Sequence, residues 1–160
     1  MLRFAKMASL GEKELTSKGV AFTSHEYDYR KKGAEAAAEG LGVNISATVK
    51  TLVVKLATGR YVFLCVCGDT KVSMRNFARA VSAKSADLAS ERDTERLTGY
   101  SLGGIGPFGS RTPLDVFIDL SVLDHDRVYI NGGRRGLLLG FDPETLIDAA
   151  NAEVIDVARL

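Results

Sequence analysis

In the 160-residue sequence, the position of Lys50 makes it a candidate for a catalytic or binding role. In the stretch VKTLVVKL, which is typical of a strand, Lys50 shares a face with Leu52, Val54 and Leu56. An isolated buried ammonium is costly, so a lysine on this apolar face must reach a cleft or a partner. Periodicity alone favours a plainer interpretation, a lysine at the start of the strand whose ammonium still reaches solvent. Lys55 has the opposite parity and is expected to face solvent.

A second candidate is the stretch GYSLGGIGPFG, residues 99–109, in which five of eleven residues are glycine and one is proline. Such a run cannot form a regular helix, because glycine costs about 1 kcal/mol and proline about 3 kcal/mol relative to alanine. It is either an awkward turn or a loop whose backbone touches a ligand, as in an oxyanion hole. It lacks the Gly-Lys-Ser/Thr ending of a phosphate-binding P-loop and the strand-then-helix setting of a dinucleotide fingerprint.

A third candidate is NGGRRG, residues 131–136, which lies between two short expected strands. Its two glycines and two arginines predict a turn that presents guanidinium groups, and these groups suit bidentate binding of phosphate. Without further context, the sequence favours a solvated hairpin loop.

The other residues with reactive or charged side chains are expected to be structural. His25 has no Gly-x-Ser-x-Gly elbow to act with and is expected to bond a neighbour in its strand. Asp115 and Asp119 share the outward parity of LDVFIDL and are expected on a solvated face. Cys65 and Cys67 share a strand face about 7 Å apart, too far for an easy disulfide, and too few further ligands accompany them for a metal site. Both are expected to be small buried hydrophobes.

Apolar periodicity and stop signals predict the elements that position these candidates. Helices are expected at 8–19, 32–43, 72–82, 90–99 and 142–152. Strands are expected at 20–28, 49–56, 60–67, 114–120, 127–131, 136–141 and 152–160. The apolar run at 60–67 indicates a central strand, paired with 49–56 in a hairpin. Because several strands are separated by only a few residues, we expect a mixed, partly barrel-like sheet with surrounding helices, of the α/β (α+β) class.

Length and composition predict one globular domain over residues 1–160, since 46% of the residues are hydrophobic and 26% are charged. The net charge of +1 gives no bulk electrostatic case for nucleic-acid binding and leaves a local basic patch open. No run of eighteen apolar residues is present, and the first residues read poorly as a secretory signal. We therefore expect a cytoplasmic protein that does not span a membrane.

Five segments, taken in their order and spacing, carry a resemblance: VKTLVV, VSMRNFARAVSAKSADLAS, LTGYSLGGIGPFG, FIDLSV and VYINGGRRGL. Together they resemble the YbaK/prolyl-tRNA-editing domain family of trans-acting aminoacyl-tRNA deacylases, from about Leu15 to the C-terminus. The joint signature is specific, although each part alone is not. The resemblance implies a YbaK-like fold and, as activity, hydrolysis of the ester that joins a wrong amino acid to the 3′ adenosine of tRNA. It also implies that neither a metal nor a cofactor is needed.

The resemblance further implies a catalytic set of Lys50, Gly103 and Gly104. Lys50 is expected to act as a charged anchor near the ester or the terminal phosphates, and the glycine amides are expected to lie against the aminoacyl carbonyl. No general base is evident, so the nucleophile is expected to be a held water or a group of the substrate. The implied substrate-binding residues, with the two arginines as candidate phosphate contacts, are Tyr27, Thr51, Ile105, Pro107, Asn131, Gly132, Gly133, Arg134 and Arg135.

Two departures from the cysteine-specific pattern of the family leave the amino acid open. Asn131 stands where serine is common, and Leu138 stands where an acidic residue is usual. The expected substrate is Cys-tRNA(Pro), or tRNA(Pro) carrying alanine, serine or another small residue. Prolyl-tRNA synthetase is a candidate partner, and neither DNA nor a membrane is expected as one. The alternative is a non-catalytic module that binds a nucleotide or an aminoacyl-tRNA, or a regulatory partner of a tRNA synthetase.

Overall fold

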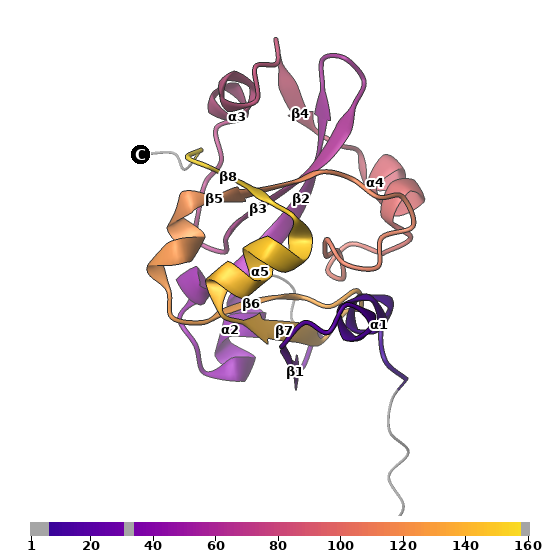
Figure 1. Cartoon of the computed structure of the whole chain (residues 1–160), viewed down its shortest axis with the longest axis vertical. Coiled ribbons are helices and arrows are strands. Elements are labelled where there is room, and N and C mark those ends of the chain that lie inside the picture. Colours follow the sequence, from indigo (N-terminus) through magenta and orange to yellow (C-terminus); the bar gives the residue numbers. More distant parts are fainter. Residues whose placement is uncertain (1–6, 31–33, 158–160) are drawn as a thin grey trace, which may run out of the picture.

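The computed structural model describes residues 7–30 and 34–157 (Figure 1). The helices are α1 (Leu10–Ser17), α2 (Ala34–Leu41), α3 (Met74–Ala80), α4 (Glu91–Thr98) and α5 (Pro143–Ala150), with short 3-10 helices η1 (Ile45–Ala47) and η2 (Leu120–Asp124). The strands are β1 (Thr23–Glu26), β2 (Thr48–Leu56), β3 (Tyr61–Cys67), β4 (Ala86–Leu88), β5 (Val116–Asp119), β6 (Val128–Asn131), β7 (Leu137–Phe141) and β8 (Glu153–Ile155).

These strands form one mixed sheet in the order β1-β7-β6-β2-β3-β5-β8, with β4 paired to β2. The pairs β2–β3 and β6–β7 are antiparallel hairpins, whereas β2–β6, β3–β5 and β5–β8 are parallel. Figure 1 shows a strongly twisted sheet, with β6 and β7 running across the direction of β2 and β3. The mixed sheet with surrounding helices, expected from the short connections between strands, is therefore confirmed.

One edge of β2 is shared by two partners. Thr48 and Val49 pair with β6, and Val54 to Leu56 pair with β4. Between these partners, residues 50–52 pair with no strand on this edge within the described chain. Crevices in sheets commonly open where neighbouring strands part. The middle of β2 is thus the place where the sheet leaves room for a site.

Apolar side chains on the two faces of the sheet form two cores. One core lies beneath α1, α4 and α5 and includes Leu15, Val53, Phe63, Leu97 and Leu146. The other lies beneath α3 and includes Val54, Leu64, Phe77 and Phe117. Alternate residues of β3 enter both cores, which confirms it as a central strand.

Helix boundaries follow local sequence signals. The Ser90 side chain accepts the backbone N–H of Asp93 at the start of α4, which ends at Gly99 with a φ of 77°. Asp142 caps α5, and Pro143 takes its first position. The five predicted helices are confirmed with slightly shorter bounds, because capping residues and stop glycines lie outside the helical turns.

Two expectations from the sequence are wrong, one at the end of β5 and one in the set of strands. Asp119 is only 1% exposed, because β8 and the chain after it cover this end of β5. Its carboxylate accepts the backbone N–H of Val157 at 2.9 Å and that of Ser121 at 3.1 Å. Asp115 does lie at the surface, where it pairs with Arg60. The three-residue strand β4 lies outside the predicted strands, since so short an edge strand leaves no alternation to read.

The expected structural roles of the histidine and the cysteines are confirmed. His25 Nε2 lies 2.7 Å from Thr23 Oγ1 within β1. Cys65 and Cys67 are buried and not disulfide-bonded. Burial raises the pKa of the Cys65 thiol to about 12, so this thiol stays protonated at neutral pH.

Candidate active site

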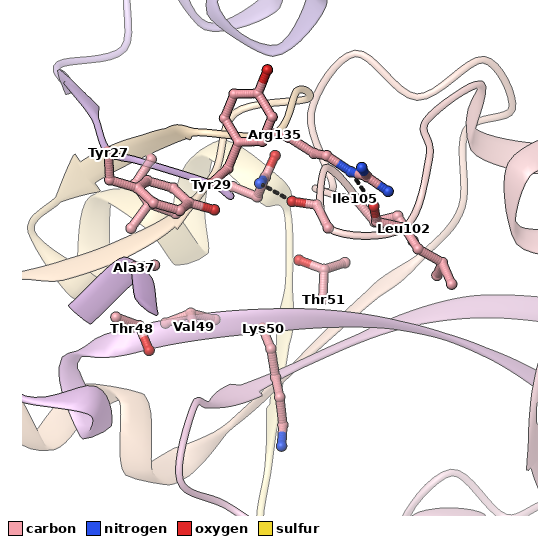
Figure 2. A pocket seen from close by; sticks show the side chains of 13 residues that line it. Tyr27, Tyr29, Ala37, Thr48, Val49, Lys50, Thr51, Leu102, Ile105 and Arg135 are labelled. Atoms are coloured by element: carbon pink, nitrogen blue, oxygen red, sulfur yellow. Dashed lines mark hydrogen bonds between the residues drawn. The ribbon is translucent and has the colours of Figure 1, made fainter. Parts of the chain in front are cut away.

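A cavity of about 450 Å³ lies beside the unpaired edge of β2 (Figure 2). Its walls come from β2, the segment after β1, α2, the glycine loop (residues 99–109) and the β6–β7 hairpin. The lining residues are Tyr27, Tyr29, Ala37, Thr48, Val49, Lys50, Thr51, Leu102, Gly103, Ile105, Asn131, Arg135 and Leu138. The three sequence candidates around residues 50, 103 and 131 therefore meet at one cavity.

The glycine loop owes much of its composition to close packing of backbone on backbone. A Cβ on Gly106 would lie 2.2 Å from the carbonyl oxygen of Asn131, and one on Gly104 would lie 3.1 Å from the amide nitrogen of Arg135. A Cβ on Gly109 would lie 2.5 Å from the backbone of Leu10 in α1. These glycines let the loop lie against the hairpin and against α1, so close packing of the backbone explains their positions.

Two side chains of the β6–β7 hairpin hold successive carbonyls of the glycine loop (Figure 2). Asn131 Nδ2 donates to the Gly103 carbonyl at 2.9 Å, and Arg135 Nε donates to the Leu102 carbonyl at 2.9 Å. The Asn131 side-chain oxygen accepts the Gly133 N–H at 2.8 Å, so both ends of this amide are engaged. The loop is thereby fixed in one position at the cavity wall.

The backbone amides of the two predicted catalytic glycines differ. The Gly104 N–H donates to the Ser101 carbonyl at 2.9 Å, within a turn of the loop. In the part of the chain that the structure describes, the Gly103 N–H has no acceptor. Gly103 has a φ of 87° and lines the cavity, whereas Gly104 is buried behind it. Gly103 is therefore the better placed of the two to donate to a ligand.

Lys50 lies on the face of β2 predicted for it, but its ammonium points away from the other cavity residues. Its Nζ donates to the Thr70 carbonyl at 2.8 Å, and Figure 2 shows the side chain directed away from Thr51 and the glycine loop. Leu52, Val54 and Leu56 on the same face pack in the second core, and Lys55 is exposed as expected. Lys50 thus lines the cavity without delivering its charge into it.

Thr51 and Tyr27 point toward the cavity interior (Figure 2). Thr51 is buried, and its hydroxyl lies 3.8 Å from the Cys65 sulfur, a weak contact that leaves the hydroxyl able to bond a ligand. Tyr27 follows β1, and its backbone N–H donates to the Gly136 carbonyl at 2.9 Å. This bond holds the backbone of Tyr27 on the hairpin, and its side chain lines the cavity.

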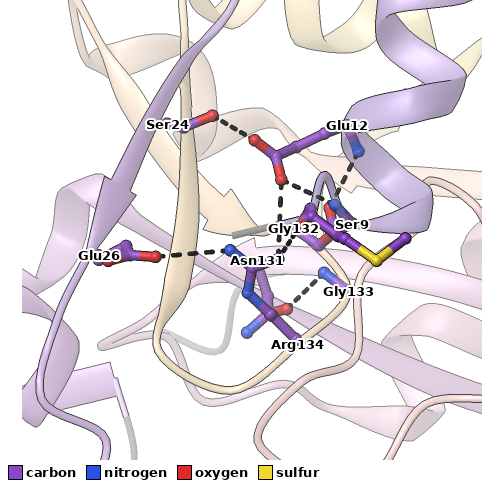
Figure 3. Close-up of polar contacts among 9 residues, drawn as sticks. Ser9, Glu12, Ser24, Glu26, Asn131, Gly132, Gly133 and Arg134 are labelled. Carbon is purple, nitrogen blue, oxygen red and sulfur yellow. Dashed lines mark hydrogen bonds and ion pairs between the residues drawn. The ribbon is translucent and has the colours of Figure 1, made fainter. Parts of the chain in front are cut away.

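Arg134 turns away from the cavity into a polar cluster beside α1 (Figure 3). Its guanidinium donates to the Met7 carbonyl at 2.9 Å and lies 3.5 Å from a Glu26 oxygen and 4.0 Å from a Glu12 oxygen. Burial raises the pKa of Glu12, but hydrogen bonds from Ser9 and Ser24, with Arg134 nearby, outweigh it and hold the pKa below its ordinary value. This cluster fastens α1 to the loop between β6 and β7.

The match to a known family covers most of this architecture. Residues 30–149 match the family described as the aminoacyl-tRNA editing domain. The chain belongs to the aminoacyl-tRNA editing domain family. The resemblance inferred from the joint motif is therefore confirmed, and the cavity of this editing domain lies where the motif segments converge.

Relatives of the editing domain include free-standing proteins and parts of larger ones. A protein of Enterococcus faecalis named as a candidate Cys-tRNA(Pro)/Cys-tRNA(Cys) deacylase is 25% identical over 141 residues, which cover 86% of this chain and 85% of the relative. A proline–tRNA ligase of Caldicellulosiruptor bescii is 34% identical over 82 residues, 51% of this chain and 14% of the ligase. A crystal structure titled as a candidate trans-editing enzyme for prolyl-tRNA synthetase shares the fold, with a TM-score of 0.85, 24% identity and coverage of 97% of this chain and 100% of that one.

The editing domain brings together only part of the predicted site. The predicted residues that line the cavity are Lys50, Gly103, Tyr27, Thr51, Ile105, Asn131 and Arg135. Those that do not line it are Gly104, Pro107, Gly132, Gly133 and Arg134. Lining residues absent from the predicted set are Tyr29, Ala37, Thr48, Val49, Leu102 and Leu138. Strand parity could have indicated Val49, and the departure at Leu138 marked that position, but no local signal marks Ala37 or Leu102.

Within the described residues, no cluster of histidine, cysteine and carboxylate side chains could hold a metal ion. No described helix is both long and apolar enough to cross a membrane.

Proposed function

We propose that this chain is a trans-acting aminoacyl-tRNA deacylase that acts on tRNA(Pro) carrying cysteine or another small amino acid. The observation that supports the proposal most is the meeting of the family motif segments at one cavity, beside a glycine loop held by Asn131 and Arg135. The named relatives support the same proposal, since one is named for deacylation of Cys-tRNA(Pro) and others are proline–tRNA ligases. We further propose that residues 1–160 act as one domain in the cytoplasm, where aminoacyl-tRNAs are formed and used.

In the proposed reaction, a water molecule adds to the carbonyl carbon of the aminoacyl ester. The bond from this carbon to the ribose oxygen then breaks, the ribose oxygen takes up a proton lost by the attacking water, and the products are a free amino acid and an uncharged tRNA. Negative charge develops on the carbonyl oxygen, and one well-placed donor is worth about 3 kcal/mol to such a transition state. The Gly103 N–H, which has no acceptor in the described chain, is the proposed donor.

Lys50 is proposed to act as an electrostatic anchor for the terminal phosphates or the ester. Because its Nζ donates to the Thr70 carbonyl, this role requires the ammonium to exchange that bond for one to the substrate. A lysine side chain has enough rotatable bonds to make this change without moving β2.

The cavity walls favour a small amino acid. Leu138, Val49 and Ile105 give apolar contacts, and the Asn131 amide is already engaged at both ends. In such a pocket one methylene group is worth only about 1–3 kcal/mol, so small amino acids are separated weakly. Cysteine, alanine and serine therefore remain the proposed amino acids. The Thr51 hydroxyl, which makes only a weak contact within the protein, is the proposed polar group for recognising one of them.

The proposal is tested by following both products after the purified chain is mixed with Cys-tRNA(Pro) and Ala-tRNA(Pro). We expect release of the free amino acid at rates well above spontaneous hydrolysis, and recovery of tRNA that prolyl-tRNA synthetase can charge again. Loss of aminoacyl-tRNA without recovery of tRNA that can be charged again would indicate damage to the RNA and would contradict a deacylase.

A second function, a non-catalytic module that binds the aminoacyl end of tRNA, is favoured by a specific observation. The Lys50 ammonium and the Gly104 amide both have acceptors outside the cavity. A chain that binds Ala-tRNA(Pro) tightly and protects its ester from spontaneous hydrolysis would establish the module in place of the enzyme.

A further inference from the structure

The mouth of the cavity carries exposed groups that the hydrolytic chemistry does not use. Tyr29 is 52% exposed and Leu102 is 42% exposed, yet both line the cavity. Exposed apolar side chains that gather at one groove, unlike scattered ones, mark ligand-binding surfaces. Figure 2 shows the three side chains along one side of the cavity, with Arg135 between Tyr29 and Leu102.

The ring of Tyr29 is seated on the hairpin beside Arg135. A Cβ on Gly136 would lie 2.6 Å from the Tyr29 ring and 3.0 Å from the Tyr27 carbonyl, and Gly136 has a φ of 82°. Only glycine leaves room for the ring at this point. The tyrosine is therefore held against the hairpin while about half of its surface faces solvent.

Arg135 is held at one nitrogen and open at the other two. A Cβ on Gly103 would lie 3.3 Å from Arg135 Nε, so the guanidinium lies across this glycine, and Nε donates to the Leu102 carbonyl. Within the described chain, its two terminal nitrogens have no acceptor and no carboxylate partner. Arg134, the next residue along, has its guanidinium engaged by Met7, Glu12 and Glu26. Of the two arginines, only Arg135 presents free donors in a fixed orientation.

We infer that Tyr29 and Arg135 form a subsite for the terminal nucleotide of an RNA strand, with the base stacked on the tyrosine ring and a phosphate bound by the terminal guanidinium nitrogens. The inference rests on the proposed function, because an ester held inside the cavity places the ribose that bears it at the mouth. Aromatic rings bind bases of any sequence by stacking, and arginine binds phosphate through paired donors. Leu102 lines the same opening, on the other side of Arg135 from Tyr29.

The test measures binding of uncharged tRNA(Pro), and of a short RNA strand ending in the same three nucleotides, at several salt concentrations. Tyr29→Ala is expected to weaken binding of both RNAs about tenfold with an unchanged salt dependence, and Tyr29→Phe is expected to bind as the parent does. Arg135→Gln keeps a side-chain donor for the Leu102 carbonyl but removes the charge. It is expected to weaken binding about tenfold and to reduce the slope of log K against log salt by about 1.

Arg79→Ala is the matched control, because Arg79 is an exposed arginine on α3, away from the cavity. The inference is overturned if Tyr29→Ala binds RNA as tightly as Tyr29→Phe does, or if Arg135→Gln loses no more RNA affinity than Arg79→Ala does. It is also overturned if the parent protein binds neither RNA. Thermal unfolding of each variant separates these results from loss of fold. Because uncharged RNA lacks the aminoacyl ester, a parent protein that binds it but hydrolyses no aminoacyl-tRNA would contradict the proposed function and leave the subsite standing.

Discussion

Lys50 and Thr51 are neighbours in β2, and their side chains point to opposite faces of the strand. The Thr51 hydroxyl lies in the cavity, and the Lys50 ammonium bonds the Thr70 carbonyl. Strand parity predicted that Lys50 shares a face of β2 with apolar residues. Parity cannot show which of two covered faces of a strand holds a cavity. The apolar face chosen from the sequence is the one packed under α3.

Replacing Lys50 tests whether its ammonium reaches the substrate during the reaction. Lys50→Ala is expected to lower kcat/KM for deacylation about 100-fold, or about 3 kcal/mol, with little change in the unfolding midpoint. Lys55→Ala is the matched control in the same strand, since Lys55 is exposed. Its kcat/KM should lie within about twofold of that of the parent protein. Equal activity of the two variants would remove Lys50 from the proposed machinery.

Asn131 connects two loops and is expected to act by positioning the glycine loop. Asn131→Asp keeps an acceptor for the Gly133 N–H but loses the donor to the Gly103 carbonyl. We expect kcat to fall about fivefold while KM changes little, because one hydrogen bond to the loop is worth about 1 kcal/mol. Steady-state kinetics measures this split, and a rise in KM alone would instead indicate direct contact with the substrate.

At the scale of elements, the glycine loop and the β6–β7 hairpin are packed so closely that side chains do not fit between their backbones. Gly106→Ala would place a Cβ 2.2 Å from the Asn131 carbonyl oxygen, and Gly106 has no positive φ to complicate the comparison. The change is expected to cost about 3 kcal/mol of unfolding free energy through overpacking. Chemical denaturation measures this loss.

Gly59→Ala, in the turn of the β2–β3 hairpin, serves as the comparison. A Cβ there meets nothing within 4 Å, but Gly59 has a φ of 90°. Its cost should be confined to the unfavourable backbone conformation, about 1 kcal/mol. Equal losses for the two variants would show that the loop can move away from the hairpin.

Most elements could be predicted from the sequence because their signals are local. Cap residues such as Ser90 and Asp142, and stop residues such as Gly99, set helix ends through contacts within three or four positions. Burial of Asp119 could not be predicted, since it depends on β8, which lies more than thirty residues further along the chain. The expected solvated face was inferred from one strand alone, without the element that covers it.

At the scale of the whole molecule, two buried acidic groups couple stability to alkaline pH. Burial raises the pKa of Tyr100 to about 12, and its hydroxyl donates to the Phe108 carbonyl at 2.7 Å. Cys65 has its pKa raised to about 12 as well. Because the folded state holds these protons more tightly, the stabilisation is complete below the unfolded pKa values and is lost as pH rises toward 12.

We therefore expect unfolding free energy to fall above pH 9–10, by up to about 1.4 kcal/mol per pH unit for each group. Tyr100→Phe should make that fall shallower between pH 10 and 12, at the cost of the bond to Phe108. Denaturation at a series of pH values gives the slope directly. A slope unchanged by Tyr100→Phe would mean that the phenol does not titrate with unfolding.

From local sequence signals alone, the candidate site could be predicted only as separate motifs, because the cavity is formed by long-range contacts. Asn131 and Gly103 are 28 positions apart, and Arg135 and Leu102 are 33 apart. The joint pattern of motifs placed Gly103, Thr51 and Asn131 at one site. It could not separate Arg135, which lines the cavity, from Arg134, which bonds the segment around α1.

We propose that the chain hydrolyses the ester of a mischarged tRNA(Pro) at this cavity and spares the correctly charged tRNA. The most direct measurement is the rate of ester loss from tRNA(Pro) charged separately with cysteine, alanine, serine and proline, with enzyme in excess. We predict rapid ester loss from at least one of the first three substrates, slow loss from the proline-charged tRNA, and loss about 100-fold slower with Lys50→Ala. Rates equal to spontaneous hydrolysis for all four substrates would contradict the claim.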